Sequence, residues 1–390
     1  MSELDLGPSV IGGSGADVES SATALHRAVI ASAAIQSSYP SPARSDLLQQ
    51  VGATSADSYL YGGLTTALGI RAVAESRGTP LSKTRRVLDW GCSSGRVIRW
   101  LGDIAGGTEL VGTDINEIAV RWCQENLPFA LAQTNGPLPP LPFPDDHFDL
   151  IFGISVVTHL DQSYERAWLA ELWRIARPGA LVLLSVHGED WAEQALSRSE
   201  LDKFSRRGFL YKRQSHASLE GLPDFYQVAF HSRGYIERTW TDLFDVDFYL
   251  KHGPLYAQQL VAMRKTGRTR GPRPAQRRRV EVDLPMGALD WQMVGSVVNG
   301  PSQLVTGWAF FPSGKSAHLR LWLDGQRVAE GVADLRRSDV AAIFPRFSTA
   351  ERSGFAWSID TGGLVPGLHA LWLTSADSEI PIGATYFGVR

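Results

Sequence analysis

The segment that most constrains the fold is residues 87–96, which read VLDWGCSSGR. An apolar run of this kind is typical of a buried β-strand, and the small residues that follow predict a tight turn leading into a helix at Arg96. Asp89 lies at the end of the strand, and Gly91 and Gly95 let the backbone of the turn approach a ligand closely. A helix that begins here presents free N–H groups and a partial positive charge, so the turn suits a carboxylate or a phosphate.

The spacing of the glycines separates this turn from two other phosphate-binding turns. A dinucleotide fingerprint needs glycine at its first, third and sixth positions, which here are Gly91, Ser93 and Arg96, so two of the three fail. A P-loop needs Gly-Lys-Ser or Gly-Lys-Thr after the turn, and neither follows. Asp114 ends the next apolar run, 25 residues after Asp89, where a carboxylate can accept both hydroxyls of a ribose. The pattern favours a nucleoside that carries an amino-acid end.

Short apolar runs alternate with amphipathic stretches over the following residues, which predicts an α/β domain with a mostly parallel sheet. The expected strands are residues 86–90, 109–114, 148–155 and 180–186, and the expected helices are residues 96–104, 117–126 and 164–176. Two final strands, residues 238–248 and 258–264, surround Gly253-Pro254, so the sheet is expected to finish in an antiparallel hairpin. Residues 191–237 are polar, aromatic and irregular, and we expect them to cap the site.

The chain of 390 residues exceeds what one hydrophobic core usually organises, so we expect more than one domain. Its start is rich in Ser, Gly, Ala and Pro, with one apolar cluster that could form at most a docking helix. Eight Lys or Arg and no acid lie within residues 264–279, which predicts a linker. The short alternating apolar runs that follow, with a hairpin signal at Asp324-Gly325, predict a β-sandwich. The expected boundaries are a mostly disordered tail over 1–45, an α/β domain over 46–265, a basic linker over 266–284 and an accessory β-sandwich over 285–390.

The α/β segment resembles a class I S-adenosylmethionine-dependent methyltransferase over roughly residues 50–265. The resemblance rests on the glycine turn, on Asp114, and on residues 141–151, 154–160 and 171–179 in that order. It implies a Rossmann-like methyltransferase sheet and S-adenosylmethionine as the cofactor. The cofactor-binding residues that it implies are Asp89, Gly91, Cys92, Ser93, Gly95, Asp114, Ile115 and Ile154. Ser93 stands where the family has its middle glycine, so we expect a tighter pocket that still binds.

A second resemblance concerns the acceptor. Residues 221–232 and 258–261, together with segments of the β-sandwich, are similar to methyltransferases found among bacterial polysaccharide functions. This implies O-methylation of a hydroxyl on a saccharide or glycolipid, with glycosyltransferases or polysaccharide-assembly proteins as partners. Two alternatives stay open: a methyltransferase for another small metabolite, and a glycan-binding or assembly module whose methyltransferase half is degenerate.

Methyl transfer from a sulfonium is an in-line displacement, so much of the rate comes from positioning the acceptor, and a base adds to it. His159 is the first candidate for that base because it follows the fourth strand, at the edge where open α/β sheets bind ligands. His187, after the fifth strand, is its rival. A metal held by His187, Glu189 and Asp190 is disfavoured, since adjacent residues after a strand usually point apart, and we predict no metal. We expect His231 to lie in a helix with a structural role.

Charge and cysteine content limit the partners. With 38 Lys and Arg against 41 Asp and Glu the formal net charge is −3, so no global field attracts nucleic acid, and we expect none to bind. The basic linker is either a solvated spacer or an electrostatic contact to an anionic membrane surface or nucleic acid. Cys92 and Cys123 are the two cysteines, and the N-terminus shows no export pattern, so we expect free thiols and a cytoplasmic location.

Overall fold

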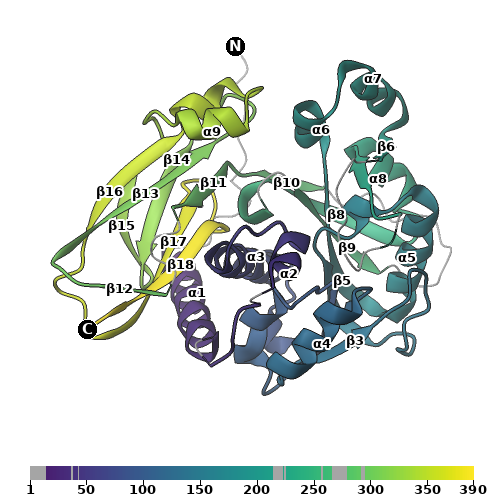
Figure 1. Cartoon of the computed structure of the whole chain (residues 1–390), viewed down its shortest axis with the longest axis horizontal. Coiled ribbons are helices and arrows are strands. Elements are labelled where there is room, and N and C mark those ends of the chain that lie inside the picture. Colours follow the sequence, from purple (N-terminus) through teal and green to yellow (C-terminus); the bar gives the residue numbers. More distant parts are fainter. Residues whose placement is uncertain are drawn as a thin grey trace, which may run out of the picture.

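The computed structural model describes residues 15–36, 38–42, 44–213, 223, 225–255, 258–265, 279–290 and 295–390. Its centre is an eight-stranded sheet in the order β10-β8-β9-β5-β4-β1-β2-β3 (Figure 1). The strands are β1 (Arg86–Trp90), β2 (Glu109–Asp114), β3 (Leu131–Thr134), β4 (Phe148–Gly153), β5 (Ala176–Val186), β8 (Phe244–Lys251), β9 (Gln259–Lys265) and β10 (Val280–Asp283). Strands β1 to β5 pair in parallel, and β9 runs antiparallel to both β5 and β8. The predicted Rossmann-like sheet with an antiparallel hairpin is confirmed.

The central strands are apolar on both faces, as expected of a parallel sheet that is covered on both sides. Val87 and Leu150 are fully buried in one apolar core, and their neighbours Leu88 and Ile151 are fully buried in the other. Helix α3 (Ala56–Ser76) belongs to the first face and α5 (Gln162–Ile175) to the second. The other elements beside these strands are η1 (Leu81–Lys83), η2 (Ile98–Ile104), α4 (Glu117–Asn126) and η3 (Val157–His159). The helix expected over residues 96–104 begins two residues later, as the 3₁₀-helix η2, because a longer turn follows β1.

The N-terminal part departs from the prediction of a mostly disordered tail. Residues Gly15–Gln36 form helix α1, and Ser45–Gln50 form α2. Val29 and Ala33 of α1 are fully buried, and the helix contacts η2, α3 and β17 (Gly367–Ser375). The prediction is wrong for these residues because small apolar side chains let α1 pack in the angle between the two domains. Residues 1–14 lie outside the described part.

The segment expected to cap the site is more regular than predicted. It contains α6 (Glu189–Ala195), α7 (Arg198–Arg207), β6 (Phe209–Lys212), β7 (Val228–His231) and α8 (Arg233–Thr239). Strands β6 and β7 pair antiparallel, and η4 (Gly253–Leu255) follows β8. His231 lies in β7 rather than in a helix, and its Nε2 is 2.6 Å from the buried carboxylate of Glu165. Residues 214–222 and 224 lie outside the described part.

The described residues of the C-terminal region form two β-sheets and the short helices α9 and η6. One sheet has the order β11-β13-β16, and the other has the order β12-β18-β17-β14-β15. Their elements are β11 (Met286–Leu289), β12 (Ser296–Val298), β13 (Ser302–Phe310), β14 (His318–Leu323), β15 (Gln326–Val332), α9 (Ser338–Ile343), η6 (Ser348–Arg352), β16 (Gly354–Asp360) and β18 (Pro381–Val389). Asp324 and Gly325 both have positive φ, at 52° and 83°, and they form the predicted hairpin turn. Trp372 is buried, and Trp322 stacks on it at 6.3 Å between ring centroids.

The two domains are packed together. The Leu289 N–H donates to the hydroxyl oxygen of Tyr61 at 2.8 Å, and the Ala384 N–H donates to Thr65 Oγ1 at 3.1 Å. Both acceptors are on α3, which lies between the large sheet and the β domain (Figure 1). The linker prediction is wrong at its end, because residues Val280–Asp283 form β10 and pair in parallel with β8. Residues 266–278 lie outside the described part.

Both cysteines, Cys92 and Cys123, are buried free thiols. Their Sγ atoms lie 3.5 and 3.3 Å from the carbonyl oxygen of Ser93, so they pack beneath the glycine turn. Within the described ranges, every helix falls short of the length or apolar character needed to cross a membrane.

Candidate active site

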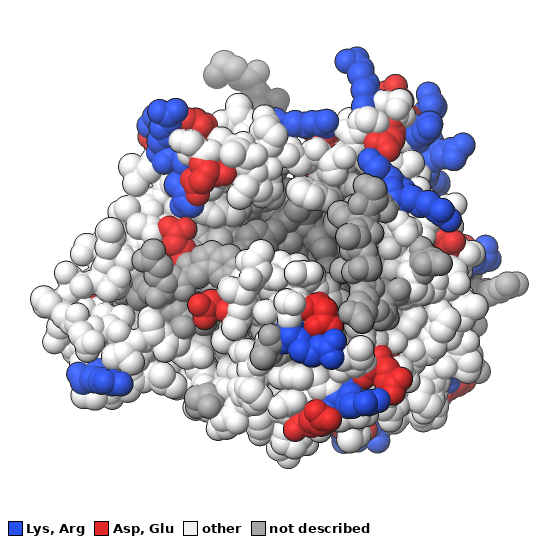
Figure 2. All heavy atoms as spheres, in the orientation of Figure 1, with Lys and Arg blue, Asp and Glu red and all other residues white. Residues whose placement is uncertain are grey.

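A cavity of about 990 Å³ opens at the carboxyl ends of β1, β2, β4 and β5. Strands β1 and β4 are parallel neighbours, but the chain continues from β1 to β2 on one side of the pair and from β4 to β5 on the other. Such a switch point is where open α/β sheets bind ligands. The face shown in Figure 2 is hollowed between the β domain and the cap helices. The predicted residues that line the cavity are Asp89, Gly91, Cys92, Ser93, Asp114, Ile115, Ile154, His159 and His187. Gly95 does not line it.

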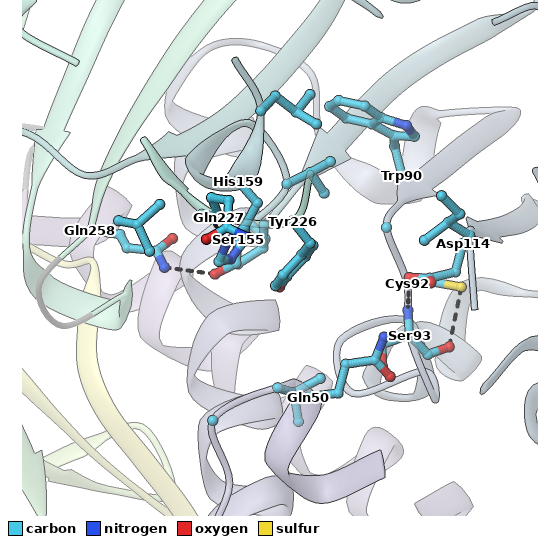
Figure 3. Close-up of a pocket in the computed structure, with 18 of the residues that line it drawn as sticks. Gln50, Trp90, Cys92, Ser93, Asp114, Ser155, His159, Tyr226, Gln227 and Gln258 are labelled. Atoms are coloured by element: carbon cyan, nitrogen blue, oxygen red, sulfur yellow. Dashed lines mark hydrogen bonds between the residues drawn. The ribbon is translucent and has the colours of Figure 1, made fainter. Parts of the chain in front are cut away.

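The lining residues fall into two groups (Figure 3). Asp114, Cys92 and Ser93 lie together at one end, and His159, Gln227 and Gln258 lie at the other. The ring of Tyr226 stands between the groups. We call these groups the acidic end and the histidine end.

The turn after β1 depends on residues that tolerate positive φ. Gly91, Ser93 and Gly95 have φ of 79°, 47° and 77°. A Cβ on Gly91 would lie 2.3 Å from a methyl carbon of Val156, so glycine is required both for conformation and for space. A Cβ on Gly95 would lie 2.4 Å from Leu127, which makes this glycine a packing residue rather than a lining one.

Asp114 holds the turn and faces the cavity. Its carboxylate accepts the Ser93 N–H at 2.7 Å and the Asn116 N–H at 2.8 Å, one at each oxygen. Burial raises its pKa, and these backbone donors oppose that rise. Each carboxylate oxygen keeps a further lone pair, so a ligand with two neighbouring hydroxyls can bind here.

Asp89 is the buried acid at the end of β1. The side chain is buried, and its Oδ2 has no hydrogen-bond partner in the described structure. Burial, and then repulsion from Asp114, raises the pKa of Asp89 to about 8. Attraction from Arg96 and a hydrogen bond from the backbone of Ile98 oppose this rise in pKa. The buried oxygen that still lacks a partner, Oδ2, favours a ligand that brings a positive charge or hydrogen-bond donors. The α-ammonium group of an amino acid meets that requirement, and the acidic end therefore fits S-adenosylmethionine.

The histidine end holds two neutral imidazoles. His159 donates from Nδ1 to the carbonyl of Gln227 at 2.6 Å and stacks on Tyr226, with ring centroids 3.8 Å apart. His187 donates from Nδ1 to the carbonyl of Ala229 at 3.2 Å. Burial lowers the pKa of His159 to about 4 and that of His187 to about 3, the latter helped by repulsion from His159. With Nδ1 carrying the proton, Nε2 of each ring is an acceptor.

Glu189 and Asp190, which were considered with His187 as metal ligands, contact other residues. Glu189 accepts the backbone N–H of Arg233 at 2.6 Å, and Asp190 lies 3.1 Å from Nε2 of His252. Neither residue lines the cavity beside His187. In the described structure the three side chains bond to different partners.

Sequence reasoning missed lining residues at both ends. Gln50 of α2 accepts the Ser93 hydroxyl at 3.1 Å and the Asn116 amide at 3.2 Å, so the serine in the glycine turn anchors an N-terminal segment over the cavity. Ser155 has φ of 61°, and its hydroxyl accepts the side-chain N–H of Gln258 at 2.6 Å. A positive φ cannot be read from sequence, and the role of Gln50 depends on how α2 packs.

Comparison with known proteins identifies the core of this site. Residues 87–179 match the family described as "Methyltransferase domain". The chain is 32% identical over 143 residues to the ubiquinone/menaquinone biosynthesis C-methyltransferases UbiE of Burkholderia mallei and Burkholderia thailandensis, a match that covers 34% of this chain and 54% of each relative. The chain thus spans about half the length of the curated relatives it matches. The prediction of a methyltransferase domain is confirmed.

Solved structures with similar folds are more distant. A SAM-dependent methyltransferase from Methanosarcina mazei is 19% identical with a TM-score of 0.36, covering 46% of this chain and 92% of that one. PigF with SAH is 17% identical with a TM-score of 0.34, covering 47% of this chain and 51% of that one.

Proposed function

We propose that this chain is a methyltransferase that holds S-adenosylmethionine at the acidic end of the cavity and methylates a hydroxyl group held at the histidine end. The observation that carries the proposal is the pair of strand-end acids, Asp89 and Asp114, which lie on either side of the turn inside the methyltransferase-domain match. Oδ2 of Asp89 lacks a hydrogen-bond partner, and Asp114 retains acceptor capacity.

Within this proposal each part of the cofactor has a partner. The ammonium of its methionine end lies at Asp89, and its ribose hydroxyls lie at Asp114. Gly91, Cys92 and Ser93 pass their backbone along it, while Ile115 and Ile154 supply apolar contacts. When bound, S-adenosylmethionine supplies an activated methyl group, and the chain's own residues position the acceptor and take up its proton.

The acceptor is proposed to be an uncharged, hydroxyl-bearing ring, such as a saccharide or the sugar of a glycolipid. None of the described residues that line the histidine end is Lys or Arg, and this supports an acceptor without a phosphate or carboxylate. Tyr226, Trp191 and Phe225 line this end and offer faces on which a ring can stack. The same aromatic lining supports a planar small metabolite as the second candidate.

His159 is proposed as the base. Its Nδ1–H is held by the Gln227 carbonyl, so the Nε2 lone pair is free to accept the proton of an acceptor hydroxyl. In that step the oxygen forms a bond to the methyl carbon, the carbon–sulfur bond breaks, and the proton moves to Nε2. Partners such as glycosyltransferases, a cytoplasmic location and a membrane contact through the basic segment remain predictions from the sequence.

The proposal is tested with a mass-spectrometric screen of neutral glycosides, lipid-linked glycans and phenols incubated with the full-length chain and S-adenosylmethionine. We expect one class to gain the mass of one CH₂ unit with equal release of S-adenosylhomocysteine. Calorimetry with S-adenosylmethionine runs beside the screen. No binding up to millimolar cofactor would favour the glycan-binding module with a degenerate methyltransferase half.

The raised pKa of Asp89 predicts a pH dependence of cofactor binding. Affinity for S-adenosylhomocysteine is expected to rise about tenfold between pH 6 and pH 7, because only the ionised carboxylate pairs with the ammonium, and the pKa of about 8 keeps most of it protonated there. Calorimetry at each pH measures this. Asp89→Asn should flatten the profile, and Asp377→Asn, which changes an exposed acid of the β domain, should not.

The Asp89 carboxyl also affects the stability of the ligand-free protein, which is expected to fall as pH rises, whereas cofactor affinity rises. A carboxyl whose pKa is raised from 3.8 to about 8 binds a proton in the folded state that the unfolded chain releases above pH 4. Its contribution to the free energy of unfolding is present at low pH and is lost as pH rises toward 8.

For the binding measurement, an affinity for S-adenosylhomocysteine that grew weaker between pH 6 and pH 7 would contradict the pairing of Asp89 with the ammonium.

A further inference from the structure

Helix α6 (Glu189–Ala195) separates the histidine end of the cavity from the β domain. Trp191 and Ala195 of this helix line the cavity. The ring of Trp191 lies 6.4 Å from that of His187, between centroids. The helix has seven residues, too few to be stable by itself in water, so its order comes from the groups that pack on it.

The β domain binds the C-terminal end of this helix through one arginine. The guanidinium of Arg346 donates to the carbonyl oxygens of Glu193 and Leu196, the latter at 3.0 Å. The last carbonyls of a helix lack partners within it and carry a partial negative charge, so an arginine satisfies them well. Gln194 adds a weaker bond to the carbonyl of Ile343, at 3.4 Å.

Apolar packing reinforces this contact. Trp191 packs against a cluster of the β domain that includes Met286, Phe310 and Phe344. It also packs against a cluster of the cap that includes Phe204 and Phe230. One tryptophan therefore faces the cavity while it touches both domains.

From these contacts we propose that the β domain is part of the acceptor site, with Arg346 as a positioning residue that holds α6, and through it Trp191, beside His187. The acidic end is built from β1, β2 and the turn between them, none of which contacts Arg346. Loss of Arg346 should therefore loosen the histidine end and leave cofactor binding intact. The inference rests on the proposed function only where it calls this end the acceptor site.

The test uses Arg346→Ala in the full-length chain, followed by hydrogen–deuterium exchange and histidine NMR. We expect the amides of Ala192 and Leu196, which bond within α6, to exchange about tenfold faster, with β1 and β4 unchanged. The Cε1–H signal of His187, identified with His187→Gln, should shift because the ring of Trp191 moves. Affinity for S-adenosylhomocysteine should stay within twofold.

Two further variants make the result decisive. Arg346→Lys keeps a cation able to reach one carbonyl and should restore part of the protection and of the His187 signal. Arg352→Ala removes an exposed arginine of the same domain that pairs with Asp334, and should change neither readout. Unchanged α6 exchange and an unchanged His187 signal in Arg346→Ala would overturn the inference. If the unmodified chain did not bind S-adenosylhomocysteine, the proposed function would be overturned instead. The two outcomes are distinct because the exchange and NMR measurements on α6 are made without ligand.

Discussion

His159→Ala is expected to lower turnover by about 10²–10⁴-fold while affinity for S-adenosylmethionine changes by less than about twofold. His159 is at the histidine end, where its Nδ1–H bonds the Gln227 carbonyl and its ring stacks on Tyr226. The substitution therefore removes an oriented proton acceptor without touching the strand-end acids. Steady-state kinetics with the acceptor found by screening, and calorimetry with the cofactor, measure the two effects separately.

The pH profile gives an independent check on the same residue. Because burial lowers the pKa of His159 to about 4, the imidazole is already neutral throughout the range from pH 6 to pH 8. Turnover at saturating cofactor should therefore lack a rise near the ordinary histidine pKa and should fall only toward pH 4. His318→Ala, at an exposed position of β14, is the matched control. Full turnover in His159→Ala, combined with loss in His187→Ala, would transfer the role of base to His187.

Asp114→Ala is expected to weaken cofactor binding by about a hundredfold, because hydrogen bonds to a charged group each contribute about 1.5–3 kcal/mol. The alanine removes the ribose acceptor and also frees the N–H groups of Ser93 and Asn116, which the carboxylate now holds at 2.7 and 2.8 Å. Asp114→Asn keeps one acceptor oxygen and should fall between alanine and the unmodified chain.

Thermal unfolding of the ligand-free variants separates binding from folding. Asp114→Ala should lower the melting temperature modestly, because the turn loses two bonds, and Asp114→Asn should lower it less. If the affinity of Asp114→Ala for S-adenosylhomocysteine matched that of the unmodified chain, Asp114 would not be the ribose acceptor.

The acidic end could be predicted from the sequence because its determinants are local. The strand, the turn and the second strand-end acid lie between Val87 and Asp114, and the parallel pairing of β1 with β2 brings the two acids together. The spacing of apolar residues and the presence of glycines in the turn predict such a unit directly. The mostly parallel sheet with its final hairpin followed from the alternation of strands and helices.

The histidine end could be predicted only in part. His159 and His187 were found because they follow strands, but Tyr226 and Gln258 come from segments whose approach depends on the packing of the cap. The extent of the N-terminal helices was underestimated for a similar reason, because the sequence indicated at most a docking helix there. Helix α1 has few large apolar residues, so its burial depends on a groove that forms only when the two domains meet.

The boundary between the domains was also misplaced. Strand β10 has four residues with alternating partial burial, a weak signal next to a run of arginines, and it joins the sheet by pairing with β8. That pairing joins segments that are distant in the sequence, so the local pattern of residues does not predict it.

A crystal structure of the full-length chain with S-adenosylhomocysteine tests directly whether Asp89 and Asp114 hold the cofactor. We expect density along the carboxyl ends of β1, β2 and β4, with the ammonium at Asp89 and the ribose hydroxyls at Asp114. An unoccupied turn under saturating ligand, or a nucleoside bound away from both carboxylates, would contradict this expectation.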